Sequence, residues 1–166
     1  MPIRNNIEAI VKQLVTPTGF VYGTKNEMNL FLDKQPLFPV VLLYPLKPIE
    51  KTETISYAIN DKFSLYLEFL VKTTFDEFTS DNEPYIIQMN NLINEFLIKL
   101  DLYKISPNEP KFFEVNVNDK RQSMPVYNKF DVNLTGCNLT LSVKTFKNDG
   151  VNPNSRPPGW VAGPYG

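Results

Sequence analysis

The clearest periodic pattern of apolar and polar positions runs from Asp81 to Tyr103, and its helical spacing predicts the main helix of the protein. At 100° per residue, the apolar side chains fall into one broad arc. The arc contains Tyr85, Ile86, Met89, Leu92, Ile93, Phe96, Leu97 and Leu100. The preceding polar run, residues 80–82, can accept hydrogen bonds from the free amides of the first turn, and Pro84 suits a helix start. We therefore expect a long helix that packs on a sheet.

Ile87 and Ile98 lie outside this arc, on a second line roughly 100° from its centre. A helix that is apolar on two sides needs a second covering surface. Two interpretations stay open: a neighbouring subunit covers both residues, or a loop of the same chain does.

Alternation also predicts a sheet in the first half of the chain. Phe38–Leu46 is a nearly unbroken apolar run that predicts a short central strand buried on both faces. Thr52–Ile59 and Lys62–Thr73 predict a hairpin with its turn at Asn60-Asp61. Tyr66 and Leu70 make the second face of this hairpin partly apolar, and we expect them to contact another subunit.

The second half of the sheet is predicted from two further segments. Lys111–Asn118 alternates and predicts a strand. The polar segment Asn118–Lys129 contains Pro125 and predicts a long projecting hairpin loop, which carries Lys120, Arg121, Met124, Tyr127 and Lys129. The last strand, Phe130–Val143, changes phase, and this predicts a β-bulge at Thr135-Gly136.

The N-terminal region predicts a short amphipathic helix that is capped by Asn5 or Asn6 and ends at Thr16-Pro17. Its apolar face contains Ile7, Ile10, Val11 and Leu14. Gly19–Lys25 predicts a short strand or extended loop, and Asn29–Gln35 predicts irregular chain.

The C-terminal segment Asn148–Gly166 is rich in proline and glycine and can form neither a helix nor a central strand. Trp160 and Tyr165 are natural anchors, because large rings bury much area for few fixed torsions. We expect an extended arm that lies on a neighbouring subunit; a segment folded back on its own domain is the alternative.

These elements predict a single α+β domain at residues 1–147, followed by the arm at residues 148–166. The domain is expected to have a mainly antiparallel sheet of four to five strands, packed against one long helix and an N-terminal helix, with a projecting hairpin.

Composition narrows the possible functions. The chain has 166 residues, 42% of them hydrophobic, and a net charge of -1, which suits one domain with a core and gives no bulk attraction to nucleic acid. There is no histidine, so the commonest general base and the usual zinc sites are excluded. The single cysteine, Cys137, is expected to be a buried thiol. No apolar run is long enough to span a bilayer, and no signal peptide is recognisable.

Candidate chemistry is sparse. The sequence contains no phosphate-binding glycine loop. Asp76, Glu77, Asp81 and Glu83 could hold a divalent ion, but helix capping and the helix dipole explain them more simply. Lys120, Arg121 and Lys129 form a small basic projection that could touch phosphates without sequence preference. We expect no cofactor, no metal site and no enzymatic activity.

The order of elements resembles that of small α/β subunits at the head-to-tail junction of tailed bacteriophages. These include tail terminators, tail-completion proteins and neck ring (head-tail connector) proteins. The resemblance rests on FPVVLLYPL, the hairpin at Asn60-Asp61, IIQMNNLINEFLIKL, and the pair FFEVNVNDKRQ and VNLTGCNLTLSV.

This resemblance implies a structural virion protein that assembles in the bacterial cytoplasm into a sixfold or twelvefold ring. It also implies contacts with adjacent neck, portal or tail proteins and the absence of catalytic residues. Two alternatives remain: an assembly adaptor outside phages, similar to a secretion-apparatus subunit, and a divalent-metal-dependent enzyme.

Overall fold

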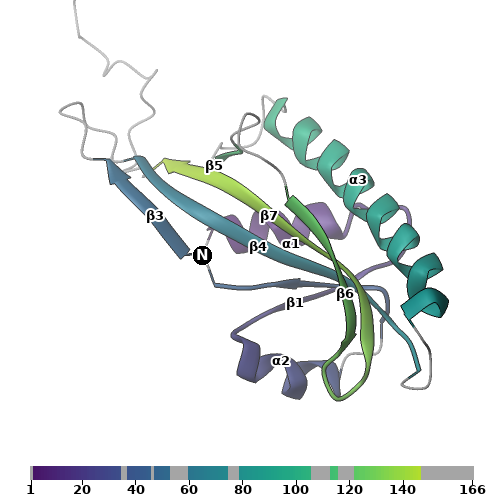
Figure 1. Ribbon diagram of the computed structural model, residues 1–166. Coiled ribbons are helices and arrows are strands. Elements are labelled where there is room, and N and C mark those ends of the chain that lie inside the picture. The colour runs from purple at the N-terminus through teal and green to yellow at the C-terminus, as the bar shows by residue number, and fades with distance from the viewer. Residues whose placement is uncertain are drawn as a thin grey trace, which may run out of the picture.

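The computed structural model describes residues 2–34, 37–45, 47–52, 60–74, 79–105, 113–115 and 122–146. In these ranges one mixed sheet carries helices on both faces (Figure 1), which confirms the predicted α+β class. The helices are α1 (Pro2–Val11), α2 (Lys25–Leu32) and α3 (Glu83–Ile105), and a 3-10 turn, Thr79–Asn82, precedes α3. The strands are β1 (Gly19–Tyr22), β2 (Val40–Leu43), β3 (Lys47–Thr52), β4 (Asn60–Lys72), β5 (Phe113–Val115), β6 (Gln122–Lys129) and β7 (Leu134–Phe146).

The seven strands occupy five positions across the sheet, in the order β1-β2-β4-β7-β5. β2 and β3 pair with successive parts of β4, and β5 and β6 pair with successive parts of β7. β1 runs parallel to β2, whereas every other pairing is antiparallel. The prediction of a mainly antiparallel sheet four to five strands wide is confirmed.

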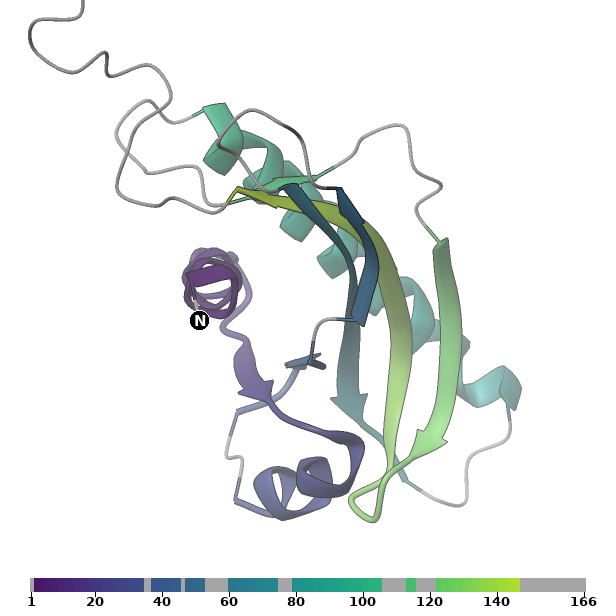
Figure 2. The same ribbon diagram turned by 90° about the vertical axis from the view of Figure 1, so that its left-hand side faces the viewer.

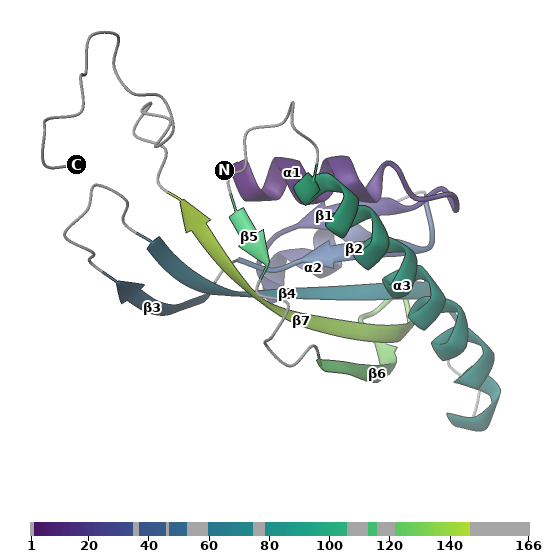
Figure 3. The ribbon, with the colours of Figure 1, turned by 90° about the horizontal axis from the view of Figure 1, so that it is seen from above.

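Alternate residues of the central strands point to two separate cores. On one face, α1 and α3 cover Val41, Leu43, Leu65, Leu67, Phe69, Cys137, Leu139 and Leu141. On the other face, α2 covers Val40, Leu42, Leu70 and Leu134. Figure 3 shows one end of α3 beside α1, while Figure 2 shows α2 at the end of the sheet near the turn between β6 and β7.

The predicted inner arc of α3 is confirmed. Met89, Leu92, Ile93, Phe96 and Leu100 are buried against the sheet, and Ile86 and Leu97 pack beside them. The rings of Phe69 and Phe96 meet edge to face with centroids 5.4 Å apart, a favoured aromatic geometry. This contact fixes α3 on β4.

The N-terminal helix begins earlier than predicted. Its apolar face, Ile7, Ile10, Val11 and Leu14, is buried as expected. However, Asn5 and Asn6 lie inside α1, which starts at Pro2. Proline suits the first helical position because an amide there has no intrahelical partner.

Helix α2 was not predicted, since Asn29–Gln35 was interpreted as irregular chain. The Glu27 carboxylate accepts hydrogen bonds from the Thr24 amide (2.8 Å) and hydroxyl (2.6 Å), which stabilises the helix start. These bonds, the one from the hydroxyl first, hold the pKa of Glu27 below its ordinary value. Only Met28 and Leu32 are buried, whereas Leu30 and Phe31 are exposed, so the apolar residues of this short helix do not form one recognisable helical face.

The hairpin of β3 and β4 exists, but its predicted turn is wrong. Asn60 and Asp61 lie in β4, opposite Thr52 and Lys51. The predicted strand Thr52–Ile59 falls almost wholly outside the described residues. The alternation along β4 is confirmed, because Leu65, Leu67 and Phe69 face the α3 core.

The segment predicted as a projecting loop forms a hairpin strand instead. Met124, Tyr127 and Lys129 lie in β6, which pairs with β7, while Lys120 and Arg121 lie outside the described residues. Pro125 is tolerated because β6, within the described part of the sheet, pairs only along one edge.

The predicted bulge is displaced from Thr135-Gly136. β4 and β7 pair without a register shift, whereas β6 gains one residue between Val126 and Lys129, opposite Thr135. A turn before Leu134 causes the change of apolar phase. Gly136 serves a different purpose: a Cβ there would lie 2.0 Å from the Phe69 carbonyl oxygen, so glycine permits close approach of the two strands.

Candidate functional site

The outer side of α3 exposes apolar side chains to solvent. Ile87 is 62% exposed and Ile98 is 61% exposed, and Leu102 near the helix end is 58% exposed. Within the described residues, no loop of the same chain covers Ile87 and Ile98. The interpretation that another subunit covers them stays a prediction.

The ionisable residues of this side, Glu95, Lys99 and Asp101, are only partly exposed. Seven residues between Pro84 and Leu102 are exposed, and none of them is ionisable. They are Pro84, Ile87, Gln88, Asn91, Asn94, Ile98 and Leu102. A solvated helix face normally carries charged side chains, whereas the centres of protein interfaces are depleted in them. We call this surface the outer α3 face.

A second unusual feature is a carboxylate buried on the opposite side of the sheet. Glu68 of β4 is completely buried. It accepts hydrogen bonds from the Tyr44 hydroxyl at 2.8 Å and the Tyr66 hydroxyl at 2.9 Å. Lys129, at the end of β6, forms an ion pair with the same carboxylate. The Glu68 cluster, Tyr44, Tyr66, Glu68 and Lys129, therefore joins the chain after β2 to β4 and β6.

Aromatic contacts hold this cluster together. The Tyr44 and Tyr66 rings meet edge to face with centroids 5.2 Å apart. The Lys129 ammonium lies 5.6 Å from the Tyr44 centroid and 4.9 Å from the Phe130 centroid, within the range of cation–π attraction. The ammonium is thus fixed in place from several sides.

Both tyrosines of the cluster resist ionisation. Burial, followed by the charge and hydrogen bond of Glu68, raises the pKa of Tyr66 to about 12. The same causes raise the pKa of Tyr44 further. Both hydroxyls therefore remain protonated donors near neutral pH, and neither supplies a general base there.

The geometry favours a structural role for the cluster. Glu68 already accepts bonds from two hydroxyls and an ammonium, so its oxygens are not free to take a proton from a substrate. The alternation of Lys62–Thr73 puts Glu68 on the same face as Tyr66 and Leu70, but the pattern does not reveal this role. The only sequence signal was an acidic residue on that face between the apolar positions Tyr66 and Leu70.

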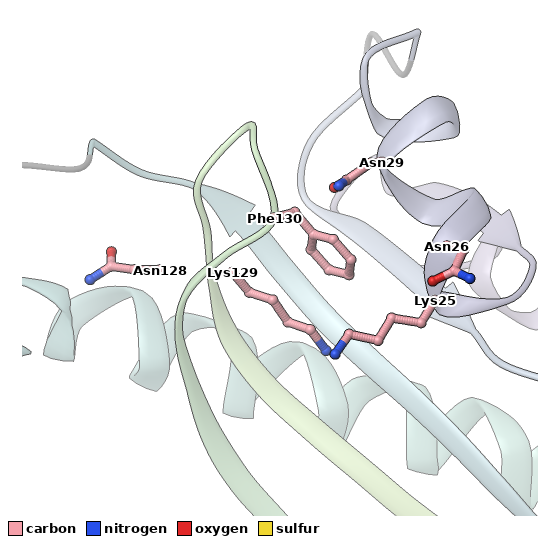
Figure 4. A pocket seen from close by; sticks show the side chains of 6 residues that line it. All are labelled: Lys25, Asn26, Asn29, Asn128, Lys129 and Phe130. Atoms are coloured by element: carbon pink, nitrogen blue, oxygen red, sulfur yellow. The ribbon is translucent and has the colours of Figure 1, made fainter.

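A shallow hollow of about 490 Å³ lies beside the cluster, between α2 and the turn after β6. It is lined by Lys25, Asn26, Asn29, Asn128, Lys129 and Phe130. Figure 4 shows Lys25 and Lys129 reaching toward each other, while Asn128 points away from the other five side chains. Because Glu68 already neutralises Lys129, Lys25 alone adds net positive charge to the lining, which is a weak basis for binding an anion.

The other predicted interface residues differ in their exposure. Leu70 is completely buried beneath α2 by its own chain, so its prediction as a subunit contact is wrong. Tyr66 is half-buried in the Glu68 cluster rather than exposed on a free face. Met124 (59%) and Tyr127 (38%) are exposed on β6. Trp160 and Tyr165 lie outside the described residues.

Cys137 is buried, as predicted, and its thiol donates to the Ile86 carbonyl oxygen at 3.6 Å. Burial raises the pKa of this thiol to about 11. A thiol that stays protonated is a poor nucleophile.

The carboxylates considered for a divalent ion are not assembled by the described part of the chain. Asp81 and Glu83 are exposed where α3 begins, and Asp76 and Glu77 fall outside the described residues. Among the described residues, no three His, Cys, Asp or Glu side chains are grouped closely enough to hold a metal ion. Likewise, no described helix combines the length and apolar character needed to cross a membrane.

No protein-family model matches this chain, and a search of curated proteins finds no significant match. The fold and its surfaces define a class: a small α+β domain with a covered sheet, an internally satisfied carboxylate cluster and a helix whose fully exposed side chains between Pro84 and Leu102 are uncharged.

Proposed function

We propose that this protein is a structural subunit of a tailed bacteriophage, forming an oligomeric ring at the head-to-tail junction or the tail end. Its mainly antiparallel sheet, long helix and β6–β7 hairpin support the resemblance to that class of ring subunits. A role in assembly needs a stable domain with contact surfaces and does not need catalytic groups.

The single observation that carries this proposal is the outer α3 face. Exposed apolar surface is unfavourable in water, and burial by a partner lowers the free energy. In a closed ring each subunit repeats the same contacts, so one such face is used by every copy. Sixfold and twelvefold rings are both compatible with this surface.

The β6–β7 hairpin is a second surface available to partners. Met124 and Tyr127 project from it with substantial exposure, and aromatic residues and methionine are enriched at interfaces. In the proposed ring this hairpin faces the channel or an adjoining neck, portal or tail protein. Lys120 and Arg121, which fall outside the described residues, stay predicted as a source of positive charge for non-specific contact with DNA.

Electron microscopy tests the proposal directly. The full chain, purified alone and after mixing with virion components, is expected to form closed rings and to be retained in particles. A protein that remains monomeric and never enters particles contradicts the proposal. Rings that form but are absent from virions would instead indicate an assembly adaptor outside the phage particle.

A further inference from the structure

The strand β6 is held to the domain by very few buried side chains. From Ser123 to Lys129, five side chains are exposed and two, those of Val126 and Lys129, are partly buried. By contrast, all four side chains of β2 are buried. Within the described part of the sheet, β6 pairs only with β7. A segment that buries so little surface needs little free energy to separate from a folded domain.

The hydrogen bonds of β6 are also irregular. The Met124 amide donates to the Asn138 side chain at 3.1 Å, and the Asn128 amide donates to the Thr135 hydroxyl at 3.2 Å. Pro125 has no amide hydrogen to donate. A register shift near the end of β6 interrupts its pairing with β7. The strand therefore lacks the continuous pairing that joins β4 to β7.

The turn after β6 contains a strained residue. Phe130 has a φ of 66°, in the left-handed region where its side chain is crowded by the backbone. Asn128 and Asn133 also have positive φ, which asparagine tolerates more easily than phenylalanine. A bulky residue keeps such a conformation only where the surrounding contacts hold it. Opening of β6 would release this strain.

The contact that opposes opening is the ion pair between Lys129, the last residue of β6, and the completely buried Glu68. The same ammonium lies 4.9 Å from the Phe130 ring centroid, so it also holds the strained residue. We propose that β6 is a strap that separates from β7 as one unit while the rest of the domain stays folded, and that the Lys129–Glu68 ion pair is the latch that keeps it closed.

The opposite end of β6 has a much weaker attachment to its surroundings. The Ser123 hydroxyl donates to the Asn90 side chain at 3.2 Å, and this hydrogen bond is exposed to solvent. Water replaces an exposed hydrogen bond at little cost, whereas breaking a buried ion pair leaves a charge without its partner. The latch is therefore at Lys129 rather than at Ser123.

A closed strap protects the edge of β7. β6 covers the backbone of β7 from Leu134 to Thr140. When the strap opens, these backbone groups lose their partners, and an unpaired strand edge is a template for pairing with other chains. The latch thus controls how often this edge is exposed. This inference concerns a single chain and goes beyond the proposed ring.

Hydrogen exchange of the full chain, followed by NMR at individual amides, tests for separate opening. The Met124 and Asn128 amides report on β6, and the amides shared by β4 and β7 report on the domain. We expect the β6 amides to exchange at least about tenfold faster than the domain amides. Their rates should depend little on low urea concentrations, because opening of one strand exposes little surface.

The Lys129→Met variant tests the latch. It leaves Glu68 without its counter-ion while β6 is closed, so exchange at Met124 and Asn128 should accelerate by the same factor, roughly thirtyfold or more. E68Q/K129M removes the unpaired charge and should restore most of the protection. Met124 lies five positions from the substitution, so its acceleration distinguishes opening of the whole strand from local disturbance at its end.

Two variants serve as controls, and circular dichroism should show that every variant is folded. Ser123→Ala removes the exposed hydrogen bond at the other end of β6 and should change exchange of the β6 amides less than about threefold. Ile10→Ala creates a cavity in the buried core on the other face of the sheet. It should accelerate exchange of the domain amides and leave the β6 amides unchanged.

Each result decides the inference. Equal exchange rates with equal urea dependence in β6 and β4 exclude a separate opening and overturn it, and this comparison needs no variant. In K129M, unchanged β6 amides contradict the latch, and acceleration confined to Asn128 indicates fraying of the strand end instead of a strap. Because every readout comes from the single chain, failure to form rings contradicts only the proposed function.

Discussion

Glu68 and Lys129 stabilise the structure only as a pair. Removing one partner of a buried ion pair leaves an uncompensated charge, which costs about 3–5 kcal/mol when both groups are fully buried. The Lys129 side chain keeps 26% of its exposure, and water therefore recovers part of this cost.

Replacing Lys129→Met should lower the free energy of unfolding by about 2–3 kcal/mol, because Glu68 is then buried without its counter-ion. Urea denaturation at pH 7 measures this change. In the double variant E68Q/K129M the charge is absent, and most of the stability should return. Equal stability of the single and double variants would contradict the buried-charge explanation.

The tyrosines of the same cluster predict a loss of stability at high pH. The pKa of Tyr66 is raised from about 10 in the unfolded chain to about 12 in the folded protein. A raised pKa means that its contribution is complete below about pH 10 and is lost as the pH rises toward 12.

Urea denaturation between pH 8 and pH 11.5 should therefore show a falling free energy of unfolding. The Tyr66→Phe variant lacks this ionisable group and should show a smaller decline over the same range. Identical pH profiles for the two proteins would argue against a role for Tyr66. Tyr44 remains in both proteins and should cause a residual decline.

At the scale of elements, Gly136 determines how closely β7 approaches β4. An added Cβ would meet the Phe69 carbonyl oxygen at 2.0 Å and Met89 Cγ at 2.9 Å. A backbone oxygen cannot move without disturbing the paired strands. Overpacking at this position therefore disturbs both the strand pairing and the packing of α3 on the sheet.

Gly136→Ala should lower the free energy of unfolding by about 3 kcal/mol or more, at the upper end of overpacking costs. Gly23→Ala is the matched control, because its Cβ would meet only the edge of the Phe31 ring at 3.0 Å and Glu27 at 3.4 Å. The ring can rotate away, so thermal unfolding of Gly23→Ala should change little. A similar loss in both variants would contradict the steric explanation.

At the scale of the whole molecule, substitutions on the outer α3 face can test assembly without changing the stability of the folded domain. The side chains of Ile87 and Ile98 contribute little to the core, since both are largely exposed. Changes at these positions should consequently affect partner contacts far more than the folded domain.

The I87K/I98K variant should retain the unfolding temperature of the unmodified monomer but fail to form rings, because two charges cannot be buried in the contact without partners. Electron microscopy and sedimentation measure assembly, and calorimetry measures stability. Leu30→Lys changes an exposed apolar residue of α2, 66% exposed, and should assemble normally. If I87K/I98K forms normal rings, the outer α3 face takes no part in the proposed assembly.

The sequence by itself determined the elements whose pattern is long and one-sided. The arc of α3, the alternation of β4, the buried face of α1 and the buried thiol of Cys137 all follow from residue periodicity, because each such segment must bury one side. The same helical periodicity places Ile87 and Ile98 outside the buried arc of α3.

Only the tertiary structure decided features that depend on distant partners. The short helix α2 is recognisable from its packing on β2 and β4, and its presence turns Leu70 from an expected contact into core. β6 is a strand because β7 supplies its hydrogen bonds despite Pro125. Glu68 is buried because Tyr44 and Lys129, 24 and 61 positions away, meet it in space. Local patterns specify which side of an element is apolar, whereas only the folded chain specifies what covers it.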